Sequence, residues 1–168
     1  MKKNFIVPEP IVNDTSSLIA LERINLLQIL CEIYSEVIIP ESVIKEFGKL
    51  SFPCLSVRKV KSNIIKLLVN DLNLGKGEAD VIALANKTGL KVIIDDSKAR
   101  KVAENMGLKL TGTIGILLKA ERLGLIDSAY KKVLELREKG FYVSDGLLKD
   151  VSKFKKNKRN QRNKRNQR

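Results

Sequence analysis

Short hydrophobic runs alternate along the chain with segments in which hydrophobic residues recur at helical spacing. The runs predict β-strands at residues 11–14, 36–39, 55–60, 91–94 and 109–111. The helical spacing predicts helices after residue 14, from residue 25, and over residues 41–47, 63–69, 78–85, 97–106, 113–123 and 127–138. Strands that alternate with helices favour a parallel sheet with helices on both faces, so we expect an α/β fold.

Acidic residues stand at the ends of two predicted strands. Asp14 ends the first hydrophobic run, and Asp95 and Asp96 come directly after the β-branched run that precedes them. In open parallel sheets, ligands bind outside the carboxyl ends of the strands. The positions of these acids therefore indicate a functional site at this edge of the sheet.

Two further acids lie on predicted helices, where spacing indicates which way they face. Glu46 is three residues from Val43, so it lies on or beside the apolar stripe of its helix. Glu78 shares a face with Ile82, whereas Asp80 is rotated from Glu78 by about 200°. We therefore expect Glu78 to point inward and Asp80 to lie behind it or in solvent.

Each of these acids has a structural reading and a chemical one. Asp14 and Asp96 are well placed to cap the helices that follow them, and Glu46 could pair with a lysine. If the acids instead converge, they suit a hard divalent cation, because Mg²⁺ and Mn²⁺ prefer oxygen ligands. We expect this second arrangement, with the catalytic metal ligands, direct or through water, being Asp14, Glu46, Glu78 and Asp96, and with Asp95 as a weaker candidate.

The residue composition excludes several other kinds of site. The chain has no histidine, which removes Ser-His-Asp triads and His-ligated zinc. Cys31 and Cys54 lack the spacing of a zinc motif, and we expect two buried, reduced thiols. No apolar run approaches the roughly 18 residues of a membrane span, and residues 1–10 contain no signal-peptide core. We expect a cytoplasmic protein with no membrane partner.

The formal net charge of +13 is concentrated at the C-terminus. Residues 1–152 carry 23 basic and 19 acidic side chains, whereas residues 153–168 carry no acid and contain a perfect repeat. We expect a folded domain over 1–152 and a disordered tail over 153–168 that binds RNA in preference to an anionic membrane. The nine basic residues of the tail are Lys153, Lys155, Lys156, Lys158, Arg159, Arg162, Lys164, Arg165 and Arg168.

The order and spacing of the acidic motifs resemble the PIN-domain family. The matching segments are Ile11-Val-Asn-Asp14-Thr-Ser16, Pro40-Glu-Ser-Val-Ile-Lys-Glu46, Gly77-Glu78-Ala-Asp-Val-Ile-Ala-Leu-Ala85 and Val92-Ile-Ile-Asp95-Asp96-Ser-Lys-Ala-Arg100. The run from Leu110-Thr-Gly-Thr113-Ile-Gly115 through Leu123-Gly-Leu-Ile126 looks like one prokaryotic branch of that family. The resemblance covers roughly residues 10–150. Glu78 stands where the family usually has aspartate, and Thr15 or Ser16 matches the hydroxyl that often accompanies the first acid.

The resemblance implies a Rossmann-like, three-layer α/β/α fold and a metal-dependent endoribonuclease acting on single-stranded RNA with Mg²⁺ or Mn²⁺. It also implies that the chain could be the toxin of a toxin–antitoxin pair, held by a small antitoxin protein, and that it could form a homodimer. Two alternatives remain. One is a catalytically inactive PIN-like module that binds nucleic acid or regulates. The other is an aspartyl phosphatase, although Ser16 occupies the position where that chemistry commonly has its second acid.

Overall fold

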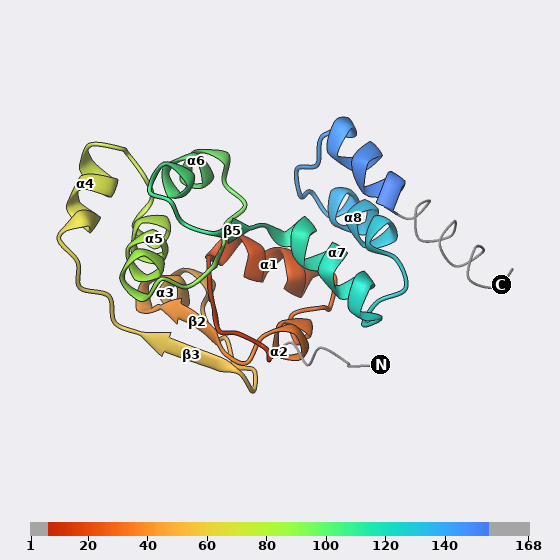
Figure 1. Ribbon diagram of the computed structural model, residues 1–168, viewed down its shortest axis with the longest axis horizontal. Helices are drawn as coiled ribbons and strands as arrows, with labels where there is room; N and C mark the ends of the chain where they lie inside the picture. Colours follow the sequence, from red (N-terminus) through yellow and green to blue (C-terminus); the bar gives the residue numbers. More distant parts are fainter. Residues whose placement is uncertain (1–6, 155–168) are drawn as a thin grey trace, which may run out of the picture. The chain divides into compact units, whose positions relative to one another are not determined.

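The computed structural model describes residues 7–154 and divides the chain into two compact units, Met1–Thr113 and Ile114–Arg168. The first unit contains a five-stranded sheet in which every pairing is parallel (Figure 1). The strand order is β3-β2-β1-β4-β5. The strands are β1 (Ile11–Asn13), β2 (Val37–Pro40), β3 (Leu55–Arg58), β4 (Val92–Ile93) and β5 (Leu110–Thr111).

Helices connect these strands, which gives the predicted three-layer α/β/α arrangement. The helices of the first unit are α1 (Thr15–Arg23), α2 (Ile29–Ile33), α3 (Glu41–Phe47), α4 (Ile64–Asn70), α5 (Lys76–Thr88) and α6 (Ser97–Asn105). Helix α5 packs against β1, β2 and β4 and against its neighbours α3, α4 and α6. Since α5 has partners on several sides, most of its length is buried.

Burial of the strands follows from their position in the sheet. All residues of β1, β2 and β4 are buried, as expected for inner parallel strands covered on both faces. Strand β3 forms an edge of the sheet and is only half-buried or exposed. The exposed edge agrees with the weak hydrophobic pattern of residues 55–60.

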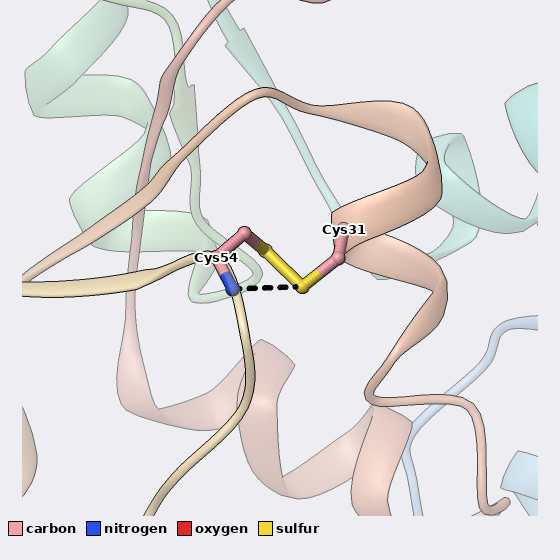
Figure 2. The surroundings of a disulfide bond; sticks show 2 residues. All are labelled: Cys31 and Cys54. Atoms are coloured by element: carbon pink, nitrogen blue, oxygen red, sulfur yellow. Dashed lines mark hydrogen bonds between the residues drawn. A yellow bond between two sulfur atoms is a disulfide. The ribbon is translucent and has the colours of Figure 1, made fainter.

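Cys31 and Cys54 form a disulfide bond, which corrects the expectation of two reduced thiols (Figure 2). Their Cα atoms are 5.4 Å apart, and the backbone N–H of Cys54 donates to Sγ of Cys31 at 3.3 Å. Cys31 lies on α2, which leads into β2, and Cys54 directly precedes β3. Because β2 and β3 are adjacent parallel strands, the topology brings these two positions together at the amino edge of the sheet.

The second unit is helical in the part that the structure describes. It contains all but the first residue of α7 (Thr113–Leu123), helix α8 (Ala129–Glu138), and a helix over residues 145–154. Lys153 and Phe154, assigned to the tail from sequence, belong to this helix, and the rest of the predicted tail lies outside the described residues. None of the helices within residues 7–154 has the length and apolar character needed to cross a bilayer.

Candidate active site

The reversal of strand order places Asp14 beside Asp95. Strand β1 pairs with β2 on one side and with β4 on the other. Asp14 follows the carboxyl end of β1, and Asp95 follows that of β4. The backbone N–H of Asp95 donates to Oδ2 of Asp14 at 3.3 Å. This is the point at which an open parallel sheet most often binds a ligand.

Asp14 is a helix cap as well as a candidate ligand. Its side chain is buried and accepts hydrogen bonds at Oδ1 from the backbone N–H of Ser17 at 2.9 Å and from the Ser17 hydroxyl at 2.6 Å. Burial raises the pKa of Asp14 to about 6, and repulsion from Asp95 adds to the effect of burial. Asp14 therefore caps the start of α1, and its buried carboxyl group is costly to ionise unless a cation lies beside it.

A pocket of about 210 Å³ opens beside Asp14. It brings together carboxylates from three different elements: the end of β1, helix α3 and the first turn of α5. The residues that line it are Asp14, Thr15, Ser16, Glu46, Gly75, Gly77 and Glu78. Three of the four acids predicted as ligands thus surround one pocket, whereas Asp95 and Asp96 are not among the residues that line it.

Glu46 reaches the pocket by a different route from the one expected. Glu46 is exposed rather than drawn toward the core, although Val43 on the same helix is buried. Its carboxylate Oε2 accepts a hydrogen bond from the Thr15 hydroxyl at 2.6 Å. The contact joins α3 to the residue that follows Asp14, and this positions Glu46 at the pocket.

Glu78 lies in the first turn of α5 and is half-buried. Its Oε2 accepts a hydrogen bond from the backbone N–H of Gly75 at 3.0 Å. Burial raises the pKa of Glu78, and repulsion from the carboxylates of Asp96 and Glu46 raises it further. Glu78 therefore shares one electrostatic environment with both of these acids.

Asp80 is buried, so the expectation that it could face solvent is wrong. Only 5 % of the residue is exposed, and its Oδ1 accepts a 2.5 Å hydrogen bond from the Lys76 ammonium. The helical wheel correctly separated Asp80 from Glu78, but it could not show that α5 is covered on several faces. Asp80 is not among the pocket-lining residues.

Asp95 and Asp96 each stabilise the start of a helix. Asp95 accepts hydrogen bonds from the backbone N–H of Thr113 at 2.8 Å and from its hydroxyl at 2.5 Å, and burial raises the pKa of Asp95. Asp96 is exposed and caps α6 by accepting from the N–H of Ala99 at 2.8 Å. Asp95 thus holds Thr113, the first residue of α7, at the connection from β5 to α7. Both acids influence the pocket by charge repulsion: Asp95 raises the pKa of Asp14, and Asp96 raises the pKa of Glu78.

Two glycines permit the close approach of acidic side chains, and sequence reasoning did not identify them as site residues. A Cβ on Gly77 would lie 2.7 Å from Oε1 of Glu46, and a Cβ on Gly112 would lie 2.7 Å from Oδ1 of Asp95. The helix predicted from sequence begins at residue 78, whereas α5 begins at Lys76 and so includes Gly77. A glycine inside a helix, where it lowers stability, is the signal that could have indicated a close contact.

The donor chemistry of the pocket fits a divalent cation. Within residues 7–154, no group of three or more His, Cys, Asp or Glu side chains is close enough together to hold a metal ion. Mg²⁺, however, is usually bound by one or two carboxylates, with water and substrate phosphate completing its coordination. Asp14 and Glu78 both line the pocket, and burial raises the pKa of both, so a cation there would offset the cost of burying their charges.

Residues 10–156 match the family of proteins described as a PIN domain. The chain belongs to the PIN-domain family. PIN domains are generally nucleases and typically use divalent metal ions, and the parallel sheet with acids at its carboxyl edge agrees with that membership. A comparison with curated proteins finds no match to this PIN domain.

Proposed function

We propose that this PIN domain is a metal-dependent endoribonuclease that hydrolyses phosphodiester bonds of single-stranded RNA. The observation that carries the proposal is the pocket into which Asp14, Glu46 and Glu78 bring carboxylates from three separate elements. Phosphodiester hydrolysis requires a water nucleophile and neutralisation of charge on the phosphate. A pocket lined by carboxylates at the ligand-binding edge of the sheet suits this chemistry once a cation is present.

Mg²⁺ or Mn²⁺ is the proposed cofactor, with Asp14, Glu46, Glu78 and Asp96 as ligands, direct or through water, and Asp95 as a weaker one. When bound, the metal lowers the pKa of a water, orients the phosphate and offsets its charge. The pocket is lined by three of these acids, and the fourth, Asp96, acts on Glu78 through charge. Asp96 would therefore contribute through water or from the pocket rim.

The side chains around the pocket fix the positions of these carboxylates. Ser17 holds one oxygen of Asp14 through two hydrogen bonds, and Thr15 holds Glu46. The N–H of Gly75 fixes Glu78 in the same way. Such contacts keep the carboxylates in place before substrate arrives, which lowers the reorganisation needed for reaction. The hydroxyl of Ser16, which also lines the pocket, is available to orient a water or a phosphate oxygen.

The biological setting follows from the resemblance to the prokaryotic branch of the family. We propose that the protein acts as the toxin of a toxin–antitoxin pair in the cytoplasm, with a small antitoxin protein as partner and a homodimer as its assembly. The nine cations of residues 153–168 would add affinity for RNA phosphates without reading bases.

The competing proposal is that the chain is a catalytically inactive PIN-like module with a nucleic-acid-binding or regulatory role. One observation favours it: within residues 7–154, no three acidic side chains lie close enough together to hold a metal ion. The deciding experiment incubates the full-length protein with unstructured RNA, the same RNA as a duplex, and single-stranded DNA, in Mg²⁺, Mn²⁺ or EDTA. We expect metal-dependent cleavage of the single-stranded RNA alone. Binding without cleavage in either metal would favour the inactive module.

A further inference from the structure

The positive charge of the domain is concentrated in one segment, residues 48–70, which contains no aspartate or glutamate. We call it the acid-free segment. It includes β3 and α4 and carries five cations, whereas the remainder of residues 1–152 carries 18 basic and 19 acidic side chains. The whole positive excess of the domain therefore lies here. The five cations are Lys49, Arg58, Lys59, Lys61 and Lys66.

Four of these cations are exposed and form no ion pair within residues 7–154; three of them follow the carboxyl end of β3, whereas Lys49 precedes β3. Arg58 forms an ion pair with Glu36 at 3.4 Å. Lys59, Lys61 and Lys66 are exposed and take no part in the ion pairs of residues 7–154. Their charges are not neutralised by any such contact, so an anionic ligand would meet three unpaired ammonium groups.

The acid-free segment reaches the same edge of the sheet as the pocket. Lys59 and Lys61 directly follow β3, and because all strands are parallel, β3 ends at the edge where Asp14 follows β1. Figure 1 shows the chain leaving the arrowhead of β3 and turning toward α4 on that side. Only β2 lies between β3 and β1, so the two strands are about 10 Å apart. Helix α3, which carries Glu46, packs against β3.

We propose that Lys59, Lys61 and Lys66 bind backbone phosphates of a single-stranded RNA whose scissile bond lies in the acidic pocket. The proposal rests on the proposed nuclease function and adds the surface that holds the flanking strand. The only aromatic residue of the acid-free segment is Phe52, which is 8 % exposed, so no ring is available to stack on a base. The contact is therefore with phosphates and is independent of base sequence.

The test compares two charge-matched triple variants of the full-length protein. The first is Lys59→Gln/Lys61→Gln/Lys66→Gln. The control is Lys87→Gln/Lys91→Gln/Lys109→Gln, which removes three exposed lysines near the amino edge of the same sheet: Lys87 in the last turn of α5, and Lys91 and Lys109 just before β4 and β5. Binding of a labelled, unstructured RNA is measured in EDTA over a range of monovalent salt, with circular dichroism melts of both variants.

The first variant should flatten the log–log salt dependence of the binding constant by about 2, since each lost contact to a single strand removes about 0.7 from the slope. At 0.1 M salt this corresponds to binding that is weaker by about a hundredfold. The control should keep the wild-type slope, and a Lys→Arg version of the first variant should restore it. Equal slopes for the first variant and its control would overturn the proposal.

The same variants separate RNA from an acidic protein as the partner. If the first variant loses affinity for polyglutamate while its RNA slope is unchanged, the surface belongs to an acidic protein and the proposal is wrong. Because binding is measured without divalent cations, the outcome does not depend on catalysis. A wild-type protein that binds RNA through these lysines but never cleaves it would contradict the proposed function; the phosphate contacts of the lysines would stand, but not the placement of a scissile bond in the pocket.

Discussion

The carboxylate of Glu46 lies against the backbone of Gly77, so closely that a Cβ there would be 2.7 Å from Oε1 and 3.0 Å from Oε2. The contact joins α3 to the first turn of α5. The Glu46 carboxylate fits at this position because Gly77 has no side chain. Together with the Thr15 hydroxyl on Oε2, it determines where Glu46 enters the pocket.

We predict that Gly77→Ala lowers cleavage activity without lowering stability. The added methyl displaces Glu46, and a displacement of about 1 Å in an active site can cost about a hundredfold in rate. Alanine favours a helix over glycine by about 1 kcal/mol, so the free energy of unfolding should not fall. The control is Gly75→Ala, whose Cβ would meet Glu78 at 3.4 Å, an ordinary contact. Equal activity for the two variants, each confirmed as folded, would show that the position of Glu46 is unimportant.

Glu78→Gln should abolish most activity, whereas Asp80→Asn should chiefly affect stability. Glu78 lines the pocket, and an amide cannot replace an anionic ligand there. Asp80 instead pairs with Lys76, and loss of that charged contact should lower the free energy of unfolding by about 1 kcal/mol. Urea melts and single-turnover rates per folded molecule test both statements. Similar rate losses in the two variants would mean that the pocket does not define the site.

The raised pKa of Asp14 predicts how stability depends on pH in metal-free buffer. Between the ordinary pKa of an aspartate, 3.8, and the raised pKa of about 6, folded protein holds the Asp14 proton more tightly than unfolded protein does. The wild type should therefore lose stability as pH rises through this window, and Asp14→Asn should not. From pH 4 to pH 7, the difference in free energy of unfolding should shift in favour of the variant by about 2 kcal/mol. A constant difference across this range, measured by urea melts, would contradict the raised pKa.

Deleting residues 153–168 should weaken RNA binding and leave the chemical step unchanged. The segment carries nine cations and no acid, so it contains none of the proposed metal ligands. If half of the cations contact phosphates at once, the log–log salt slope should flatten by about 3. Single-turnover rates at saturating RNA should match those of the full chain. A full-length chain with the nine cations changed to Gln separates charge from length, and identical slopes for all three proteins would show that the tail does not bind RNA.

The framework of the site was predictable because it depends on local pattern and parallel topology. The hydrophobic runs before Asp14 and Asp95 predicted strands, and the capping positions of Asp14 and Asp96 were visible in the residues themselves. Pro40 and Gly48 set the limits of α3, so its bounds followed from sequence. Parallel strands then place acids at one edge without further information.

Contacts between distant segments could not be predicted in the same way. The pairing of Cys31 with Cys54 depends on which strands are neighbours, and the burial of Asp80 depends on how many elements cover α5. Neither is encoded in helical spacing. The fit of Glu46 against Gly77 is likewise a contact between two helices, and a single sequence shows only that a glycine interrupts a good helix.

The central claim is that the acidic pocket of this PIN domain hydrolyses RNA with a divalent cation. The most direct measurement compares wild-type and Asp14→Asn proteins, both confirmed as folded by circular dichroism, on one unstructured RNA in Mg²⁺ and in EDTA. The account predicts cleavage by the wild type in Mg²⁺, none in EDTA, and none by Asp14→Asn in either condition. Full cleavage by folded Asp14→Asn in Mg²⁺, or cleavage by the wild type that persists in EDTA, would contradict it.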